Sequence, residues 1–263
     1  MRALFGQPSG QVRFDWGLTG ALALTGQPGT AAVVVDVLSF TTSVSVAAGL
    51  GIEVLPFRWR DDRAAEFAVE HGAELAGGRG AGGPSLSPAS IQAWAGDPPS
   101  VGGTPRATSD RLVLPSPNGS SICFALAERG NPVIAGCLRN AAAVAGWLAA
   151  ETAAGRVSAV AVIAAGEHWP DGSLRPAVED LWGAGAVLDR LSRVLPGLPF
   201  TPEARAAAAA FTAIEPDVAA ELAGCTSGRE LIEDGFDRDV ALAADLDADP
   251  VVPVLDGRRF RPT

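Results

Sequence analysis

Apolar runs alternate with segments of helical periodicity along most of this chain. Four of the runs lie at residues 32–35, 111–115, 132–137 and 157–165, and each ends in a polar turn followed by a helical pattern. Continuous apolar runs are typical of strands buried on both faces of a parallel sheet. The repeated order of strand, turn and helix indicates an α/β protein. We therefore predict a three-layer α/β/α fold with a mostly parallel sheet.

Shorter patterns complete this prediction. Residues 12–16 and 52–57 predict two further strands, and helices are expected at residues 18–24, 43–48, 61–75, 122–128, 141–150, 178–195, 202–211, 216–223 and 237–246. Ser227-Gly228-Arg229-Glu230 predicts a capping box at the start of another short helix. Residues 251–255 predict a last strand at a sheet edge, because Pro253 lacks a backbone N–H. We expect one domain over residues 1–263, with sub-halves of about 1–110 and 111–263 as the alternative.

Residues 77–105 interrupt this regularity. The segment is rich in Gly and Pro, and neither helical nor strand periodicity is evident in it. Loops of this length inside compact domains are usually functional or disordered. A surface excursion is the simpler interpretation, and a lid over a binding site is the other. We predict that the segment lines the site, with Arg79 as its ligand-contacting residue.

Composition excludes several functions. The chain of 263 residues has a net charge of −10 and no block of basic residues, so nucleic acids and anionic membranes are poor partners. It contains no Lys, which excludes Schiff-base chemistry and a Walker-type phosphate loop. No apolar run reaches the length of a membrane span, and we expect a cytoplasmic protein. The three cysteines, widely separated, suit buried free thiols.

Polar side chains gather where the predicted strands end. They are Asp36 with Thr41 and Thr42, Asn118 with Ser120 and Ser121, Arg139 with Asn140, and Glu167 with Glu179 and Asp180. The carboxyl ends of parallel strands share one edge of a sheet, so these groups are expected along that edge. Acids, hydroxyls and amides without Lys or clustered His suit Mg²⁺ that holds a phosphate. Asp36, Glu179 and Asp180 are the candidate ligands.

Each candidate also has a simpler interpretation. Glu179 and Asp180 can merely complement a helix macrodipole, whereas Asp36 closes a buried strand and is costly there unless paired or ligated. Residues 116–121 form either a turn with a helix cap or an anion nest at a helix N-terminus. Arg139 can bind a phosphate or sulfonate, or lie on the surface. His168 is a further catalytic candidate. The aspartyl-nucleophile pattern fails, because Leu38 stands where a second Asp is needed.

Four strand-end motifs together resemble the 2-phosphosulfolactate phosphatase family. They are residues 36–42 (DVLSFTT), 116–120 (SPNGS), 139–141 (RNA) and 178–185 (VEDLWGAG), and the late segment from Ser227 to Pro253 is also similar. The resemblance spans nearly the whole chain. It implies a Mg²⁺-dependent phosphohydrolase that acts on a small sulfonated phospho-acid in the coenzyme M pathway of methanogens.

The chain departs from the family motifs at three places. Ser39 stands where the first motif often has Arg, Gly78 replaces an acid before Arg79, and Leu86 replaces an Asn before Ser87-Pro88. These changes leave two hypotheses open. The first is a Mg²⁺-dependent phosphatase of 2-phosphosulfolactate or a similar acidic phosphoester, and the alternative is a non-catalytic protein that retains the anion pocket. A dinucleotide-binding oxidoreductase is disfavoured, because no G-x-G-x-x-G follows a predicted strand.

The leading hypothesis assigns a role to each candidate. Asp36 with Glu179 or Asp180 would hold Mg²⁺, and water would be the attacking group. The residues expected to bind phosphate or the second anionic group are Thr41, Thr42, Asn118, Gly119, Ser120, Arg139, Asn140, Arg79 and Ser87. The partner is a small anionic phosphoester. A homodimer is compatible with the sequence, which leaves the oligomeric state open.

Overall fold

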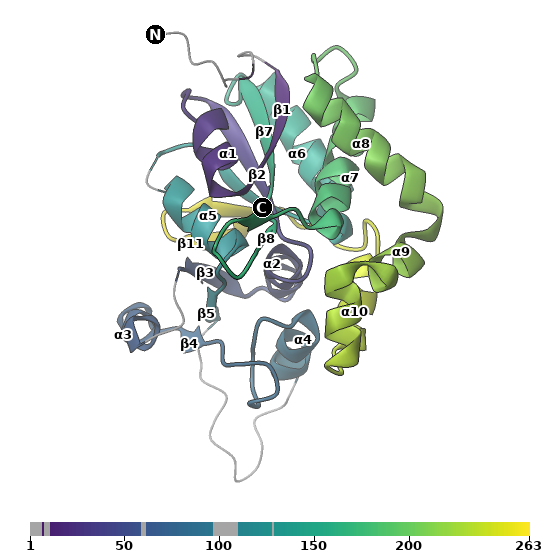
Figure 1. The fold of residues 1–263 in the computed structure, drawn as a ribbon. Coiled ribbons are helices and arrows are strands. Elements are labelled where there is room, and N and C mark those ends of the chain that lie inside the picture. The colour runs from purple at the N-terminus through teal and green to yellow at the C-terminus, as the bar shows by residue number, and fades with distance from the viewer. Residues whose placement is uncertain (1–6, 8–10, 59–61, 97–109, 128) are drawn as a thin grey trace.

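The computed structural model describes residues 7, 11–58, 62–96, 110–127 and 129–263, and they form an α/β structure (Figure 1). The strands are β1 (Val12–Trp16), β2 (Thr30–Val35), β3 (Glu53–Phe57), β4 (Glu74–Leu75), β5 (Arg111–Pro115), β6 (Val133–Gly136), β7 (Ala159–Ala164), β8 (Glu167–His168), β9 (Leu174–Arg175), β10 (Pro253–Asp256) and β11 (Arg259–Pro262). The helices are α1 (Gly17–Leu24), α2 (Phe40–Gly49), α3 (Asp62–His71), α4 (Pro88–Gly96), α5 (Gly119–Ala127), α6 (Ala141–Ala153), α7 (Val178–Val194), α8 (Pro202–Ile214), α9 (Val218–Gly224), α10 (Thr226–Glu233) and α11 (Asp237–Ala244).

The main sheet consists of two parallel half-sheets joined by the C-terminal hairpin. Its order, over the described residues, is β1-β7-β2-β6-β10-β11-β3-β5-β4. The first half-sheet, β1-β7-β2-β6, is parallel throughout, and so is the second, β3-β5-β4. Strands β10 and β11 are antiparallel to each other and to the strands that flank them. Each half-sheet contains strands from both sides of residue 110. The boundary between the alternative sub-halves 1–110 and 111–263 therefore does not separate two sheets.

The hairpin reverses the direction of the second half-sheet relative to the first. Its antiparallel pairings with β6 and β3 each rest on one register pair, Val254 with Ile134 and Phe260 with Val54. In a flat sheet this reversal would place the carboxyl ends of β2 and β5 at opposite edges. The two ends nevertheless meet, since the N–H of Gly119, just after β5, donates a hydrogen bond to Asp36, just after β2. The expectation of one common edge is therefore corrected to two edges that meet.

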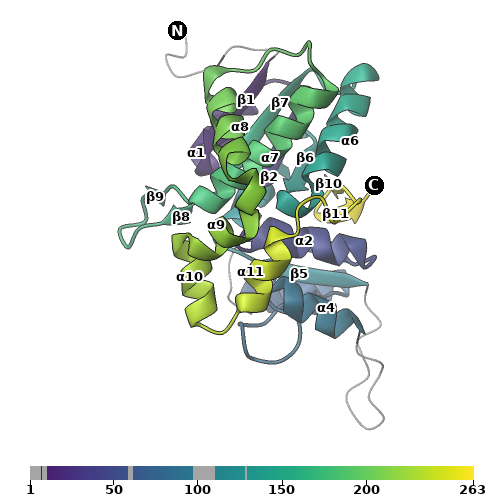
Figure 2. The ribbon, with the colours of Figure 1, turned by 90° about the vertical axis from the view of Figure 1, so that its right-hand side faces the viewer.

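Helices cover both faces of the first half-sheet, which confirms the three-layer architecture. Alternate residues of β2 point to opposite sides, as strand geometry requires. Val33 and Val35 pack in a core with α6, α7 and α8, while Ala32 and Val34 pack in another with α1, α2 and α5. Figure 2 shows α6, α7 and α8 on the near side of these strands. Helix α2 is buried along nearly its whole length.

Several local predictions need correction. Helix α4 lies inside the segment predicted to lack structure, and it begins at a Ser-Pro pair in which Ser87 Oγ accepts the N–H of Ser90. Cys225, not Ser227, caps α10, since its sulfur accepts the N–H of Gly228. The strand predicted at residues 251–255 corresponds to β10, and it is internal rather than at an edge, because β11 pairs with it and lies between it and β3. A small hairpin, β8-β9, follows the strand β7.

Two simple expectations agree with the structure. All three cysteines are buried and free. Within the part of the chain that the structure describes, every helix is too short or too polar to cross a membrane.

Candidate active site

Asp36 lies at the point where the carboxyl ends of the two half-sheets meet. Its Oδ1 accepts the N–H of Phe40 at 3.0 Å, and its Oδ2 accepts the N–H of Gly119 at 2.8 Å. Its own backbone is held by Thr41, whose Oγ1 accepts the N–H of Asp36 and donates to its carbonyl oxygen. The carboxylate is thus fixed by the first residues of α2 and α5.

Burial makes the Asp36 carboxyl an unusually weak acid. Desolvation raises its pKa to about 6, helped by the nearby charges of Glu167 and Glu179, while the N–H groups of Phe40 and Gly119 act in the opposite direction. A carboxyl of this kind is half protonated near pH 6, and its ionised form is stabilised by a cation beside it.

Asp180 comes to the same place from the first turn of α7. Its Oδ1 accepts the N–H of Val37 at 2.7 Å, and its Oδ2 accepts the N–H of Gly166 at 2.8 Å. Burial raises its pKa well above the usual range, and the charges of Asp36 and Glu179 raise it further. The helix approaches closely because of Gly183, where a Cβ would lie 2.5 Å from a methyl of Val37. A glycine at position 183 is therefore required for this packing.

Glu167 and Glu179 complete a group of four carboxylates that we call the acidic centre, with Asp36 and Asp180. Glu179 is buried. The pKa of Glu167 is raised by burial and by the charge of Glu179, against the hydrogen bond from Asn118 and the charge of Arg175. The mutual repulsion of these carboxylates would be relieved by a cation bound beside them.

Asn118 links the acidic centre to His168. Its Nδ2 donates to Glu167 Oε2 at 2.8 Å, and its Oδ1 lies 2.9 Å from Nδ1 of His168. Because an amide oxygen only accepts, Nδ1 of His168 carries the proton in this contact. A cavity of about 230 Å³ lies against Asn118 and His168. The amide of Asn118 thus fixes the orientation of both Glu167 and His168.

The acidic centre suits a hard cation by its chemistry. Among the described residues, no group of three or more His, Cys, Asp or Glu side chains has the arrangement of a complete metal site. Mg²⁺ does not need one, since it usually retains water and takes one or two carboxylates together with substrate phosphate oxygens. Each oxygen of Asp36 and Asp180 accepts one N–H, so a second lone pair remains on each.

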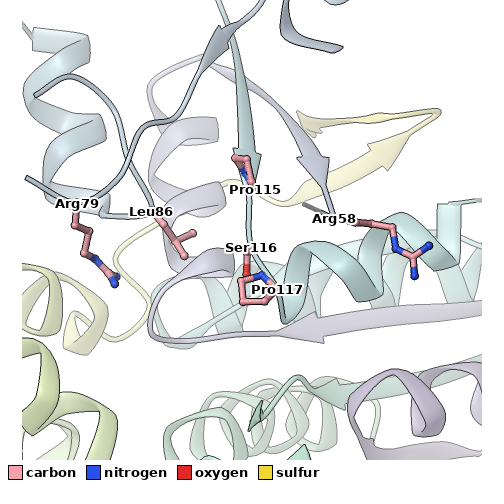
Figure 3. Close-up of a pocket in the computed structure, with 6 residues that line it drawn as sticks. All are labelled: Arg58, Arg79, Leu86, Pro115, Ser116 and Pro117. Atoms are coloured by element: carbon pink, nitrogen blue, oxygen red, sulfur yellow. The ribbon is translucent and has the colours of Figure 1, made fainter. Parts of the chain in front are cut away.

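A cavity of about 450 Å³ lies next to the turn that follows β5. It is lined by Arg58, Arg79, Leu86 and residues 115–117, and Figure 3 shows the two arginines on opposite sides of Pro117, with the Arg58 side chain directed away from it. This arginine-lined cavity adjoins the acidic centre through its lining residues Ser116 and Pro117, which lead into Gly119, whose N–H donates to Asp36.

Arg79 ties the Gly-rich segment to the turn after β2. Its Nη2 donates to Oγ of Ser39 at 2.8 Å, and its guanidinium lies over the ring of Phe236, 5.3 Å from the ring centre. Its Nε is 3.8 Å from Oδ2 of Asp239. The described part of the segment therefore lies beside the Asp36 turn and lines a cavity, while the contact of Arg79 with a ligand stays a prediction. Residues 97–105 of the predicted lid lie outside the described residues.

Ser87 anchors the same segment to α11. Its Oγ donates to Oδ1 of Asp239 at 2.7 Å, and the N–H of Ala89 donates to the same oxygen at 3.0 Å. Asp239 is almost fully buried and holds the start of α4. The structure thus gives Ser87 an anchoring contact, and its predicted contact with substrate stays a prediction.

The buried hydroxyls near the acidic centre bond to the backbone. Thr42 Oγ1 donates to the carbonyl oxygen of Val37 at 2.7 Å, and Ser120 Oγ donates to that of Phe57 at 2.9 Å. With Thr41 bound to Asp36 in the same way, these hydroxyls hold the two turns in place. Their predicted role in phosphate binding remains a prediction.

Arg139 and Asn140 are engaged elsewhere. The guanidinium of Arg139 forms a two-pronged ion pair with Asp249, at 2.9 Å for each prong, and a further ion pair with Asp245. The side chain of Asn140 accepts the N–H of Cys137 and donates to the carbonyl oxygen of Ala135. Both side chains therefore fasten the loop after β6, and the contacts observed do not direct them to the acidic centre.

Two residues that contact the site were absent from the prediction. Arg58 stands next to a strand end but lacks a motif of its own. Asp239 is separated from Ser87 by most of the chain, and only the fold reveals their contact.

Cys123 and Arg129 stand at the spacing of cysteine-dependent phosphatases. Cys123 lies inside α5, fully buried, and burial together with the charge of Asp36 raises the pKa of its thiol well above the usual range. A thiol in this state is not a nucleophile.

The fold and the site define an α/β enzyme whose acidic centre and arginine-lined cavity lie at the carboxyl ends of its strands. The chain belongs to the 2-phosphosulpholactate phosphatase family, whose model matches residues 21–258. Members of this family are phosphoric monoester hydrolases. The resemblance seen in the sequence motifs is thereby confirmed. No curated protein matches the chain.

Proposed function

We propose that this enzyme is a Mg²⁺-dependent phosphatase of a small phosphoester that carries a second acidic group, such as 2-phosphosulfolactate. One observation carries the proposal: the acidic centre lies beside the arginine-lined cavity. The acidic centre attracts a cation, and the arginine-lined cavity attracts an anion. A phosphoester that binds through a metal needs a site for the metal and a site for its own negative charge.

The metal would be held by Asp36 together with Glu179 or Asp180. When bound, Mg²⁺ would neutralise phosphoryl oxygens and make a bound water more acidic. The protein's contribution is to keep the carboxylates in place, through the N–H groups of Phe40 and Gly119 for Asp36. A rigid set of ligands minimises reorganisation during the reaction.

Glu167 is the best-placed group to accept a proton from the attacking water. Its carboxylate is oriented by Asn118, and its raised pKa brings it nearer to the working pH, which favours general-base catalysis. His168 lies on the other side of the Asn118 amide and is a second candidate for this proton transfer.

The substrate's second acidic group would lie at Arg79 and Arg58. Arginine suits a sulfonate or carboxylate because its planar fork presents paired donors. Ser39 stands where the family motif often has Arg, so the cationic side of the cavity depends on these two residues.

The test is phosphate release from 2-phosphosulfolactate by wild type, Asp36→Asn and Asp217→Asn, each with Mg²⁺ and with a chelator. Asp217 is exposed and serves as the matched control. We expect wild type and Asp217→Asn to require Mg²⁺, and folded Asp36→Asn to be inactive. Unchanged turnover of Asp36→Asn would contradict the metal assignment. Thermal stabilisation by the phosphoester without hydrolysis would favour the non-catalytic alternative.

A further inference from the structure

A second arginine-rich cavity, of about 530 Å³, lies away from the active site. It is lined by Leu55 of β3, His71 at the end of α3, Arg111 at the start of β5, and Asp256, Arg258 and Arg259 of the β10–β11 turn. The starts of β3 and β5 face this region, whereas the active site lies at their carboxyl ends. The two cavities are thus at opposite ends of the same strands.

Positive charge is concentrated around this cavity. Glu53 accepts from Arg111 Nε at 3.0 Å, Arg259 Nη1 at 2.9 Å and Arg261 Nε at 3.0 Å. Arg261 also pairs with Asp256 at 2.8 Å. The two carboxylates, Glu53 and Asp256, cannot neutralise three guanidinium groups, and exposed Arg258 adds a fourth. In a chain with a net charge of −10, such an excess of cations at one place is unusual.

The cluster is already organised without a ligand. Burial acts to raise the pKa of Glu53, but the hydrogen bond from Arg111 and the charges of Arg259 and Arg261 outweigh it and lower that pKa. Glu53 is therefore ionised and holds the three arginines in place. His71 is fixed as well, since its Nδ1 bonds to the carbonyl oxygen of Phe67 and its ring stacks on that of Phe67.

We propose that this cavity is a second anion site, which binds a small, multiply charged anion of the phosphate or pyrophosphate class. Each guanidinium has five donors, and the contact of Arg259 with Glu53 uses one nitrogen, Nη1. Arg111, Arg258 and Arg259 line one concavity, and planar guanidinium groups match a tetrahedral oxyanion, which accepts paired hydrogen bonds. The concave shape and the size favour a small molecule over a macromolecular partner.

Binding at this place would act on the joint between the half-sheets. Arg259 belongs to the hairpin, whereas Arg111 belongs to the second half-sheet, and the hairpin meets β3 through a single register pair. An anion that bridges these arginines adds a link across the joint. A ligand that binds the native state alone stabilises it by mass action.

The experiment is calorimetric titration of inorganic pyrophosphate into metal-free wild type and three variants. Arg258→Gln alters the second anion site, Arg79→Gln alters the active-site cavity, and Arg205→Gln alters an exposed arginine on α8 as control. We expect Arg258→Gln to weaken a pyrophosphate-binding event about tenfold, the effect of one lost charge-assisted contact. Arg205→Gln and Arg79→Gln should leave this event unchanged.

Two outcomes would overturn the proposal. One is that wild type does not bind pyrophosphate in a manner sensitive to Arg258. The other is that Arg79→Gln abolishes all binding while Arg258→Gln matches wild type, which would place the anion in the active site. Because the titration measures binding without turnover, its result is independent of whether the enzyme hydrolyses the proposed substrate. A rise in the thermal unfolding midpoint with pyrophosphate, reduced in Arg258→Gln, would provide a second readout.

Discussion

The backbone N–H of Gly119 donates to Oδ2 of Asp36 at 2.8 Å, and this bond joins the ends of two strands from oppositely directed half-sheets. Position 119 has no room for a side chain. A Cβ there would lie 2.8 Å from Cβ and Oδ2 of Asp36 and from the ring of Phe40. The glycine is therefore needed for close approach, and the contact sets the position of the carboxylate.

Gly119→Ala is expected to impair both activity and stability. The added methyl would push α5 away from Asp36, and a displacement of about 1 Å at a catalytic group can reduce the rate roughly 100-fold. Overpacking of a buried site also costs about 1–3 kcal/mol. Phosphate release and urea unfolding measure the two effects.

Gly146→Ala is the matched control, because Gly146 lies within α6 and a Cβ there would meet nothing within 4 Å. Alanine is the better helix former by about 1 kcal/mol, so this variant should be slightly more stable and fully active. Wild-type activity of Gly119→Ala would show that the close contact does not position Asp36.

The elements of the fold were largely predictable, but their arrangement was not. The apolar runs that became β2, β5 and β7 are continuous and easy to recognise. The reversal of one half-sheet depends on β10 and β11, short strands whose pairings with β6 and β3 rest on Val254 and Phe260. Such long-range pairings leave almost no local pattern in a sequence.

Mg²⁺ is expected to stabilise the enzyme more at pH 7.5 than at pH 5. The pKa of Asp36 is raised to about 6, and that of Asp180 is raised as well. At pH 5 protons occupy much of the acidic centre and compete with the metal, whereas at pH 7.5 Asp36 is ionised. Thermal unfolding with Mg²⁺ and with a chelator, at both values of pH, measures this difference.

The metal-free protein should show the opposite trend for this carboxyl. A carboxyl whose folded pKa is raised is more acidic in the unfolded chain, so its contribution to stability falls as pH rises from about 4 through about 6. Asp36→Asn should lack this contribution and much of the Mg²⁺ effect. An equal Mg²⁺ shift at both values of pH would argue against the acidic centre as the metal site.

Arg139→Ala is expected to destabilise the protein without changing substrate affinity. The Arg139 side chain is 8% exposed and Asp249 is 14% exposed, so removing the arginine leaves a largely buried carboxylate unpaired. Breaking a buried pair of this kind costs about 3–5 kcal/mol. Urea unfolding of Arg139→Ala, Asp249→Asn and the double variant measures the coupling. A raised KM with unchanged stability would instead support the predicted role in substrate binding.

Arg79→Ala should discriminate between substrates. The loss of one charged contact is expected to raise the KM for a phosphoester with a second acidic group about tenfold. A simple aryl phosphate lacks that group and should be affected much less. Arg58→Ala, from the opposite wall of the cavity, shows whether both arginines share this role. Equal effects of Arg79→Ala on the two substrates would remove Arg79 from recognition of the second group.

As with the fold, one part of the candidate site was predictable from the sequence and another part was not. Asp36 and Asp180 were predictable, because acids that end a buried strand or begin a helix stand out in the pattern. The engagement of Arg139 with Asp249 was not, since an arginine has the same appearance in a sequence whether it binds substrate or an internal carboxylate.

Asp239→Asn is expected to loosen the Gly-rich segment and so weaken substrate binding. The carboxylate accepts from Ser87 and Ala89 and lies 3.8 Å from Arg79, so it fastens both the start of α4 and the arginine of the cavity. An amide keeps one acceptor but loses the charge that attracts the guanidinium. We expect a higher KM, little change in kcat, and faster proteolysis within residues 77–96. Asp237→Asn, an exposed change on the same helix, is the control. If Asp239→Asn matched this control in both KM and proteolysis, the segment would be held by contacts other than Asp239.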